Sequence, residues 1–251
     1  MDLGLADRVF VLTGASKGLG YATAQALVAD GAKVVISSRD PDRVNDAVTA
    51  LGRNAAGLAA DLATPTAADD LVATARDRFG RFDGALISVG GPPRGPAAAI
   101  TDEQWRDAFE TVFLGTVRAA RTFAEALTAG GAIGFVLSSS VREPISGLGL
   151  SNGLRPGLAG VAKDMADHYG GRGVRFVGLL PGRLLTDRNR ELFDAGPDPE
   201  QAAADAAAAI PLGRLGEPAE FGKVAAFVLS PAAGYVTGIT LPIDGGALRG
   251  I

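Results

Sequence analysis

Thr13-Gly14-Ala15-Ser16-Lys17-Gly18-Leu19-Gly20 is the stretch that decides the fold class of this chain. It follows an apolar run over 9–12, which the pattern predicts as a buried strand, and precedes a segment with helical spacing that starts near Tyr21. A strand, a glycine-rich turn and a helix together form a nucleotide-binding unit, because the N–H groups of the first helical turn face an anion. A glycine-rich match alone is weak evidence, but both flanking elements are present here. We therefore predict a nucleotide site built from Gly14, Ser16, Lys17, Gly18, Leu19 and Gly20.

Each glycine of this stretch has its own expected role. Gly14 can adopt a positive φ in the tight turn. Gly18 removes a side chain where a phosphate must approach the backbone, and Gly20 allows the helix to pack closely on the strand.

The remaining chain alternates apolar strands with amphipathic helices. We expect strands at 33–38, 55–60, 84–89, 132–138, 174–180 and 239–243, and helices at 41–51, 65–79, 103–129, 152–169 and 217–229. Thr64 is the expected N-cap of the second of these helices, and Thr101 with Gln104 predicts a capping box for the third. This alternation indicates the α/β class, with one doubly wound parallel sheet covered by helices on both faces. No shift of composition divides the chain, so 1–251 is expected to be a single domain.

The segment 186–213 interrupts this alternation. It is polar at first and rich in alanine over 201–210. In a doubly wound sheet it would lie beyond the carboxyl ends of the strands, where ligands bind. We expect it either to cover the substrate as a mobile lid or to be only a poorly packed pair of surface helices.

Composition excludes several classes of function. The 251 residues are 47% hydrophobic, enough for one large buried sheet. The net charge of −4 gives no indication of a nucleic-acid partner. The chain has no cysteine and a single histidine, so we expect neither a disulfide nor a metal site. No apolar run is long enough for a membrane span and no signal-peptide pattern is present, so we expect no membrane partner and a cytoplasmic location.

Further motifs make the chain resemble the short-chain dehydrogenase/reductase family over nearly its whole length. They are Asp61-Leu62, Pro181-Gly182 with Thr186, and the tail Tyr235-Val-Thr-Gly-x-x-Leu-Pro-Ile-Asp244-Gly245-Gly246. The segment Arg214-Leu-Gly216-Glu-Pro218-Ala-Glu220 is similar to the 3-oxoacyl carrier-protein reductase branch. The resemblance implies one Rossmann-type domain of about seven parallel strands, and a homodimer or homotetramer. In many relatives the two long helices pair across a two-fold axis, and here they carry the small residues Ala119, Ala120, Gly157 and Gly160.

The catalytic residues depart from the family pattern. The family uses a serine, a Tyr-x-x-x-Lys pair and an asparagine of the preceding long helix, but no tyrosine of this chain has a lysine four residues later. Alignment through 157–160 places Ser151 at the tyrosine position and Arg155 at the lysine position. The asparagine falls at Val112, and the family's Asn-Asn-Ala-Gly turn reads Ile87-Ser88-Val89-Gly90.

A serine survives in 138–140. Ser140 fits best by local pattern, while Ser138 has the spacing to Ser151 that suits the family. The catalytic candidates are therefore Ser140, Ser138, Ser151 and Arg155. A serine hydroxyl is a poorer acid than a phenol, whose pKa is about 10. Arg155 lies on the same helical face as Ser151 and stays charged, so it is expected to hold the nicotinamide ribose or a substrate anion rather than donate a proton.

Three charged residues keep alternative interpretations. Arg142 and Glu143 follow the serine strand, where Glu143 could serve as an acid if burial raised its pKa, or both could form a solvated pair. Arg183 could bind an anionic substrate group or simply cap the sheet edge. Trp105 is expected to serve in packing.

The end of the second predicted strand bears on the choice of cofactor. Ser38 followed by Arg39, with Lys17 in the glycine turn, favours the 2′-phosphate of NADP(H). Asp40 lies one residue beyond Arg39, and its carboxylate could instead accept a hydrogen bond from a ribose hydroxyl of NAD(H). The resemblance places Asp61 and Leu62 at the adenine, with a turn cap as the alternative for Asp61. It adds Val89, Gly90, Arg155, Pro181, Gly182 and Thr186 to the cofactor site.

Two functions follow from these observations. The first is an NADP(H)-dependent oxidoreductase that reduces a small ketone or 3-oxoacyl-like carbonyl with an altered proton relay. The second is a cyclase, an isomerase or a catalytically silent partner subunit that keeps the nucleotide site. The cofactor motif favours the first, and the missing Tyr-x-x-x-Lys pair favours the second.

Overall fold

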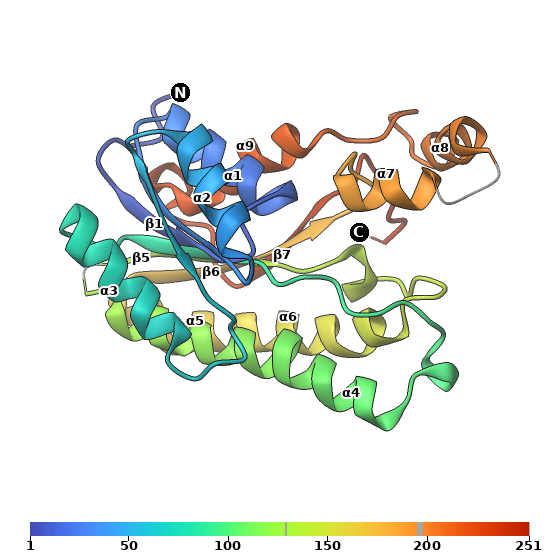
Figure 1. Cartoon of the computed structure of the whole chain (residues 1–251), viewed down its shortest axis with the longest axis horizontal. Coiled ribbons are helices and arrows are strands. Elements are labelled where there is room, and N and C mark those ends of the chain that lie inside the picture. The colour runs from blue at the N-terminus through green and yellow to red at the C-terminus, as the bar shows by residue number, and fades with distance from the viewer. Residues whose placement is uncertain (129, 195–197, 251) are drawn as a thin grey trace.

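The computed structural model describes residues 1–128, 130–194 and 198–250. Within these residues, seven parallel strands form one sheet in the order β3-β2-β1-β4-β5-β6-β7 (Figure 1). The order reverses at β1, which pairs with both β2 and β4, and ligands of doubly wound sheets bind at such a switch point. The strands are β1 (Val9–Leu12), β2 (Lys33–Ser38), β3 (Ala55–Ala59), β4 (Gly84–Ile87), β5 (Gly131–Val136), β6 (Val174–Pro181) and β7 (Ile239–Ile243). The predicted doubly wound α/β fold is confirmed.

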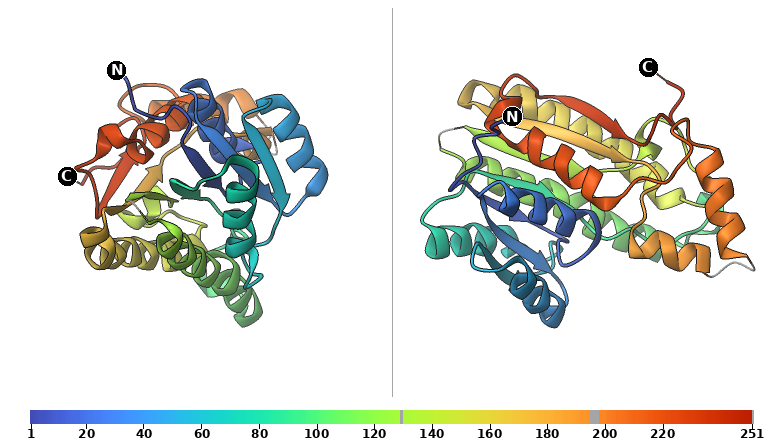
Figure 2. Two further views of the ribbon diagram at one scale, coloured as in Figure 1. Left: turned by 90° about the vertical axis from the view of Figure 1, so that its left-hand side faces the viewer. Right: turned by 90° about the horizontal axis from the view of Figure 1, so that it is seen from above.

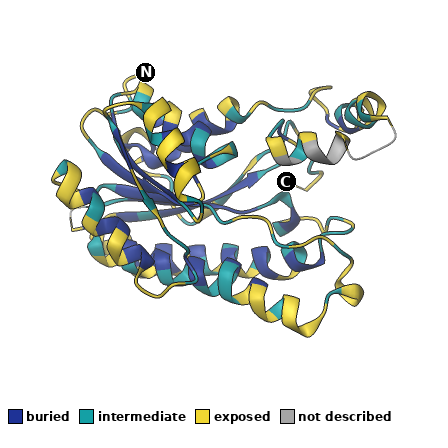
Figure 3. Ribbon diagram, viewed as in Figure 1, coloured by how far each residue is buried: buried dark blue, intermediate teal, exposed yellow. Residues whose placement is uncertain are grey.

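Helices cover both faces of the sheet (Figures 1 and 2). One face carries α1 (Gly18–Ala29), α2 (Pro41–Leu51) and α9 (Pro218–Leu229). The other carries α3 (Ala67–Phe79), α4 (Asp102–Ala108), α5 (Gly115–Ala126) and α6 (Gly149–Tyr169). Each helical layer buries its own apolar cluster against the strands, as the dark central ribbons of Figure 3 show. Short helical turns lie at Ala97–Ala99, Ser139–Val141, Gly170–Arg172 and Pro231–Ala233.

The predicted long helix over 103–129 is divided into three parts. Its start is as expected, because Gln104 N–H donates to the Thr101 hydroxyl (3.2 Å) and Thr101 N–H donates to the Gln104 amide oxygen (3.0 Å). A π-helical stretch, Phe109–Leu114, then separates α4 from α5. No glycine or proline lies inside this stretch, and Gly115 follows it as the first residue of α5. The last predicted residue, 129, lies outside the described residues.

Thr64 is not the N-cap of α3. Its N–H and carbonyl take part in a turn with Asp61 and Ala67, so the helix begins only after Thr66. The Thr66 hydroxyl in turn donates to Asp70 and gives no cap to the backbone. The polar residues after β3 therefore form a turn before the helix can start.

The segment 186–213 contains two helices, α7 (Asp187–Asp194) and α8 (Pro199–Ala208). They extend beyond the carboxyl ends of the strands, at the right of Figure 1. Asp198 caps α8 by accepting from Gln201 N–H, and Ala206 and Ile210 are buried. The helix pair is thus present, while residues 195–197 of the segment lie outside the described residues.

Aromatic rings of α4 and the π-helical stretch pack on the glycines of α6. A Cβ at Gly153 would lie 2.8 Å from the ring of Trp105, and one at Gly157 would lie 2.8 Å from the ring of Phe113. Ala119 and Ala120 are buried in the core of their own chain. Gly157 and Gly160 are exposed on α6, so the pairing of the two long helices with a second copy stays a prediction.

Candidate functional site

The turn after β1 ties two strands together at the switch point. The Thr13 hydroxyl donates to the Ser88 carbonyl (2.8 Å) and accepts from Ser88 N–H (2.9 Å), which joins the ends of β1 and β4. Gly14 has φ +57°, and a Cβ there would lie 2.5 Å from the same carbonyl oxygen. Both the positive φ and the close approach therefore require glycine at position 14, in accordance with its predicted role.

The N-terminus of α1 provides an open site for an anion. The helix begins at Gly18, three residues before the start that its apolar spacing suggested, so Gly18, Leu19 and Gly20 form its first turn. N–H groups there have no partner within a helix, and the N-cap residue Lys17 makes no side-chain cap. Gly18 has φ +60° and a Cβ there would have no atom within 4 Å, whereas a Cβ at Gly20 would lie 2.8 Å from Cα of Ala15. Free donors beside open space fit the phosphates of a dinucleotide.

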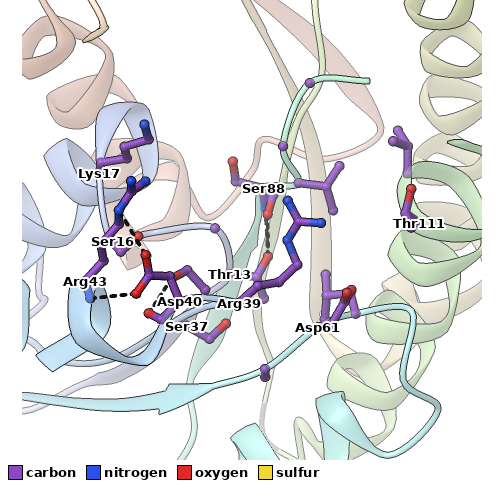
Figure 4. A pocket seen from close by; sticks show the side chains of 18 of the residues that line it. Thr13, Ser16, Lys17, Ser37, Arg39, Asp40, Arg43, Asp61, Ser88 and Thr111 are labelled. Carbon is purple, nitrogen blue, oxygen red and sulfur yellow. Dashed lines mark hydrogen bonds and ion pairs between the residues drawn. The ribbon is translucent and has the colours of Figure 1, made fainter. Parts of the chain in front are cut away.

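A cavity of about 510 Å³ lies at the carboxyl ends of β1, β2 and β4 (Figure 4). Predicted cofactor residues that line it are Gly14, Ser16, Lys17, Ser38, Arg39, Asp61, Leu62, Val89 and Gly90. Predicted cofactor residues that do not line it are Gly18, Leu19, Gly20, Arg155, Pro181, Gly182 and Thr186. Residues for which no role was predicted also line the cavity, among them Arg43, Ser37, Pro92, Pro93 and Thr111.

Three basic residues line this cavity, with Lys17 and Arg43 on one side and Arg39 nearer to Ser88 (Figure 4). Lys17, Arg39 and Arg43 line it together with Ser38, whose hydroxyl donates to the Asp40 carbonyl (3.3 Å). The Asp40 carboxylate caps α2 by accepting from the N–H groups of Asp42 and Arg43 (3.1 and 3.2 Å), and it also pairs with the Arg43 guanidinium (3.0 Å). Because its oxygens already have these partners, Asp40 is less suited to a ribose hydroxyl than its sequence position suggested.

Asp61 lies on the far side of the cavity from Lys17 (Figure 4), and Leu62 also lines the cavity. The Asp61 carboxylate accepts from Ala63 N–H (3.0 Å), which is the turn cap named as its alternative role. One carboxylate has four lone-pair directions, so this cap leaves Asp61 able to accept from a ligand as well.

Two serines meet at the carboxyl end of β5. Ser140 is buried in the turn Ser139–Val141, and its Oγ lies 3.0 Å from Oγ of Ser151 on α6. Ser138 does not take part: its Oγ accepts from Ser140 N–H (3.1 Å) and caps the turn. Of the two alternatives that the spacing left open, the structure therefore pairs Ser140 with Ser151. Ser138 accepts a backbone N–H but keeps its own O–H as a donor, so the catalytic roles of Ser138 and Ser140 both stay predictions.

Arg155 lies one turn after Ser151 on α6 and is 6% exposed. Its guanidinium donates from Nη1 to the Val136 carbonyl at the end of β5. A buried charge requires such polar partners, and this bond fixes α6 against the sheet. The role of Arg155 toward a ribose stays a prediction.

The three tyrosines of the chain are either packed against other parts of the protein or exposed to solvent. The Tyr169 phenol donates to Glu125 (2.9 Å), and burial together with that carboxylate raises the pKa of Tyr169. Tyr235 is fully exposed, and Tyr21 packs against the core on the α1 side of the sheet. Val112, at the position of the family asparagine, is buried and lines the cavity with an apolar side chain.

Arg142 and Glu143 do not supply a buried acid. Both are exposed and do not pair with each other. Arg142 donates to the Thr240 hydroxyl (3.0 Å), and Glu143 accepts from Arg249 N–H (3.0 Å). They connect the loop after Ser140 to β7 and to the C-terminal tail.

The residues after β6 lie on the same edge of the sheet but outside the cavity. Gly182 N–H donates to the Ile243 carbonyl (3.0 Å), and a Cβ at Gly182 would lie 2.6 Å from Cβ of Asp244. The Thr186 carbonyl accepts from Asn189 and Arg190 at the start of α7, so Thr186 opens that helix. Arg183 is exposed, and its carbonyl accepts from Gly216 N–H.

The described residues contain neither a metal-binding cluster nor a helix that could span a membrane. No group of three or more histidine, cysteine or acidic side chains in 1–128, 130–194 and 198–250 could hold a metal ion. No helix within those ranges combines the length and the hydropathy needed to cross a bilayer.

Known proteins are similar to this chain in both sequence and architecture. A family model described as enoyl-(acyl carrier protein) reductase matches residues 14–247. The 3-oxoacyl-[acyl-carrier-protein] reductase of Vibrio cholerae is 30% identical over 246 residues, which cover 97% of this chain and 98% of that protein. The structure of L-sorbose reductase from Gluconobacter frateurii, complexed with NADPH and L-sorbose, has a TM-score of 0.94 with 27% identity and full coverage of both chains. A short-chain oxidoreductase from Pseudomonas aeruginosa PAO1, described as containing an atypical catalytic center, has a TM-score of 0.92 with 28% identity and full coverage of both.

Proposed function

Because this chain belongs to the short-chain dehydrogenase/reductase family of oxidoreductases, we propose that it is an NADP(H)-dependent reductase of a small ketone or 3-oxoacyl-like carbonyl. The observation that carries the proposal is the cavity lined by Lys17, Arg39 and Arg43, in which Lys17 is also the N-cap residue at the uncapped start of α1. A 2′-phosphate is dianionic, and guanidinium groups bind phosphate through paired N–H donors. The NADPH held by L-sorbose reductase supports the same cofactor here.

Ser140 and Ser151 would orient the substrate. Each hydroxyl carries one hydrogen, and one of the two hydrogens is used in the bond between them. The other is then available to donate to a carbonyl oxygen, which would polarise the carbonyl for attack at its carbon. Bound NADPH supplies the hydride for that carbon.

The proton of the product alcohol would come from water. A serine hydroxyl is a poorer acid than a phenol, and Arg155 remains protonated at any working pH. Ser151 is partly exposed, so water can reach the hydroxyl pair. The altered relay is therefore a hydrogen-bonding pair that stabilises a developing alkoxide, with solvent as the proton source.

The second candidate is a non-redox or catalytically silent protein that keeps the nucleotide cavity. It is favoured by the placement of Ser151 and Arg155 where relatives carry tyrosine and lysine, and by the engagement of Tyr169 with Glu125. Such a protein would bind NADPH without oxidising it.

Absorbance of NADPH during incubation with a panel of cyclic and 3-oxoacyl ketones tests the proposal. The parent should oxidise NADPH. Ser151→Ala should lower kcat by roughly 10²–10³-fold, as removal of a preorganised donor does, with the NADPH Kd unchanged. Ser146→Ala, an exposed serine nearby, is the matched control and should behave as the parent.

Restoring the family pair makes the test decisive. Ser151→Tyr with Arg155→Lys should turn over faster if a carbonyl is already placed for hydride transfer. If both the parent and this double variant bind NADPH and reduce nothing, the non-redox candidate replaces the reductase.

We also propose a cytoplasmic homodimer or homotetramer. An apolar hollow of about 440 Å³ beside α4 is lined by Trp105, Phe109 and Leu154, with Arg106 and Glu110 at its rim. Phe109 is 46% exposed and stacks on Phe113 (5.1 Å between ring centroids). A second copy that covers this surface would bury an aromatic pair.

A further inference from the structure

Ser140 and Ser151 come together although they are eleven residues apart, and the loop 142–148 connects them. The middle of this loop is held by the side chain of Asn152. Its amide oxygen accepts from Ile145 N–H (3.0 Å), and its amide nitrogen donates to the Ile145 carbonyl (2.8 Å). The Asn152 amide thus binds both polar backbone groups of one residue.

Asn152 is also fixed at its own backbone. Its N–H donates to the Leu148 carbonyl (2.9 Å) in the first turn of α6, directly beside Ser151. This is the first hydrogen bond of the helix, so the side chain that holds Ile145 comes from a residue already fixed in α6. The Asn152 contact divides the chain between Ser140 and Ser151. Only a few residues on each side of Ile145 can then move independently.

The other anchors of the loop are at its ends. Arg142 and Glu143 bind Thr240 and the tail residue Arg249, as described above. Near the other end, Gly95 N–H donates to the Gly147 carbonyl (2.8 Å), and Gly149 N–H donates to the Gly95 carbonyl (2.9 Å). These contacts fix the loop to its neighbours, whereas the Asn152 contact fixes it to the helix that carries Ser151.

We infer that Asn152 is a positioning residue that keeps the Ser140 and Ser151 hydroxyls within hydrogen-bond distance by clamping Ile145. Asn152 acts through the loop, and its own amide is occupied by the backbone. Its effect on turnover rests on the proposed function, whereas its effect on the loop and on the separation of the serines does not.

The test uses Asn152→Ala, Asn152→Asp and the control Asn45→Ala on the full chain. Asn152→Ala removes both bonds. Asn152→Asp is nearly isosteric and keeps the acceptor for Ile145 N–H but loses the donor to the carbonyl. Asn45 is an exposed asparagine of helix α2, so its replacement controls for the loss of a helical asparagine.

Hydrogen–deuterium exchange at the Ile145 amide measures the clamp directly. We expect exchange at least about tenfold faster in Asn152→Ala, a smaller change in Asn152→Asp and none in Asn45→Ala, because a broken hydrogen bond exposes the amide. A crystal structure of Asn152→Ala should show the two serine Oγ atoms more than about 3.5 Å apart, beyond hydrogen-bond distance.

Turnover per NADPH-binding site then separates positioning from general destabilisation. We expect kcat per site to fall on the order of tenfold with little change in the NADPH Kd, since misplacement of a donor weakens its effect in the transition state. A merely structural role would lower the number of binding sites and leave kcat per site unchanged, and that result would overturn the inference. If the parent proves inactive, the proposed function fails, but an unchanged serine distance with unchanged Ile145 exchange would still refute the clamp.

Discussion

Gly18 gives the most direct test of the cofactor site, because the chain contains a matched control. Gly18 and Gly80 both have positive φ (+60° and +79°), and a Cβ at either position would have no atom within 4 Å. An L-residue in the left-handed region costs roughly 1–2 kcal/mol, so Gly18→Ala and Gly80→Ala should lose similar stability. For a chain of this size each kcal/mol lowers Tm by about 2–4 °C. Differential scanning calorimetry should therefore give both variants similar Tm values, below that of the parent.

Cofactor binding should separate the two variants. Gly80 ends α3, away from the cavity, whereas Gly18 opens the first turn of α1 where we place the phosphates. A methyl group at Gly18 would occupy that open space, and a loss of about 1.4 kcal/mol raises Kd tenfold. Fluorescence titration with NADPH should show at least a tenfold weaker Kd for Gly18→Ala and an unchanged Kd for Gly80→Ala. Equal affinities in the two variants would refute the assignment of this turn to the phosphates.

Three further outcomes follow from other parts of the chain. Arg39→Ala should weaken NADPH binding more than NADH binding, and an unchanged ratio of the two Kd values would remove Arg39 from the 2′-phosphate site. Phe109→Glu should shift the mass measured by light scattering toward the monomer, and a monomeric parent at micromolar concentration would exclude the proposed interface. The Glu220 carboxylate, hydrogen-bonded by Arg214 and by the Glu217 N–H, has its pKa lowered from 4.5 to about 2. Ionised Glu220 therefore stabilises the fold above pH 4.5 and loses this effect as pH falls through 2, so the Tm of Glu220→Gln should fall less than that of the parent over this range.

The parts of the fold that local patterns determine could be predicted from the sequence. Strands at 9–12, 33–38 and 239–243 and the helix at 41–51 have the predicted bounds, since apolar runs and a proline at the helix start mark them. The glycine turn was equally predictable, because Gly14 and Gly18 have positive φ and Gly20 packs closely on Ala15, which are local properties that glycine permits.

The parts that depend on contacts across the chain could not be predicted. Spacing alone could not separate Ser138 from Ser140, because a single helical turn decides which hydroxyl points toward α6. The π-helical stretch contains no glycine or proline that would indicate it, and Gly153 and Gly157 pack against aromatic rings of the same chain. Arg43 belongs to the site through its position in the first turn of α2, which becomes visible only when α2 is placed beside the cavity.

The packing of Trp105 on Gly153 also gives the molecule an optical reporter. Trp105 is the single tryptophan of the chain, so all indole emission comes from this one contact with α6. Gly153 lies on the same helix as Ser151 and Arg155, within one turn of each. Any shift of α6 that accompanies ligand binding should therefore change the wavelength or the intensity of the Trp105 emission maximum, with no label attached to the protein.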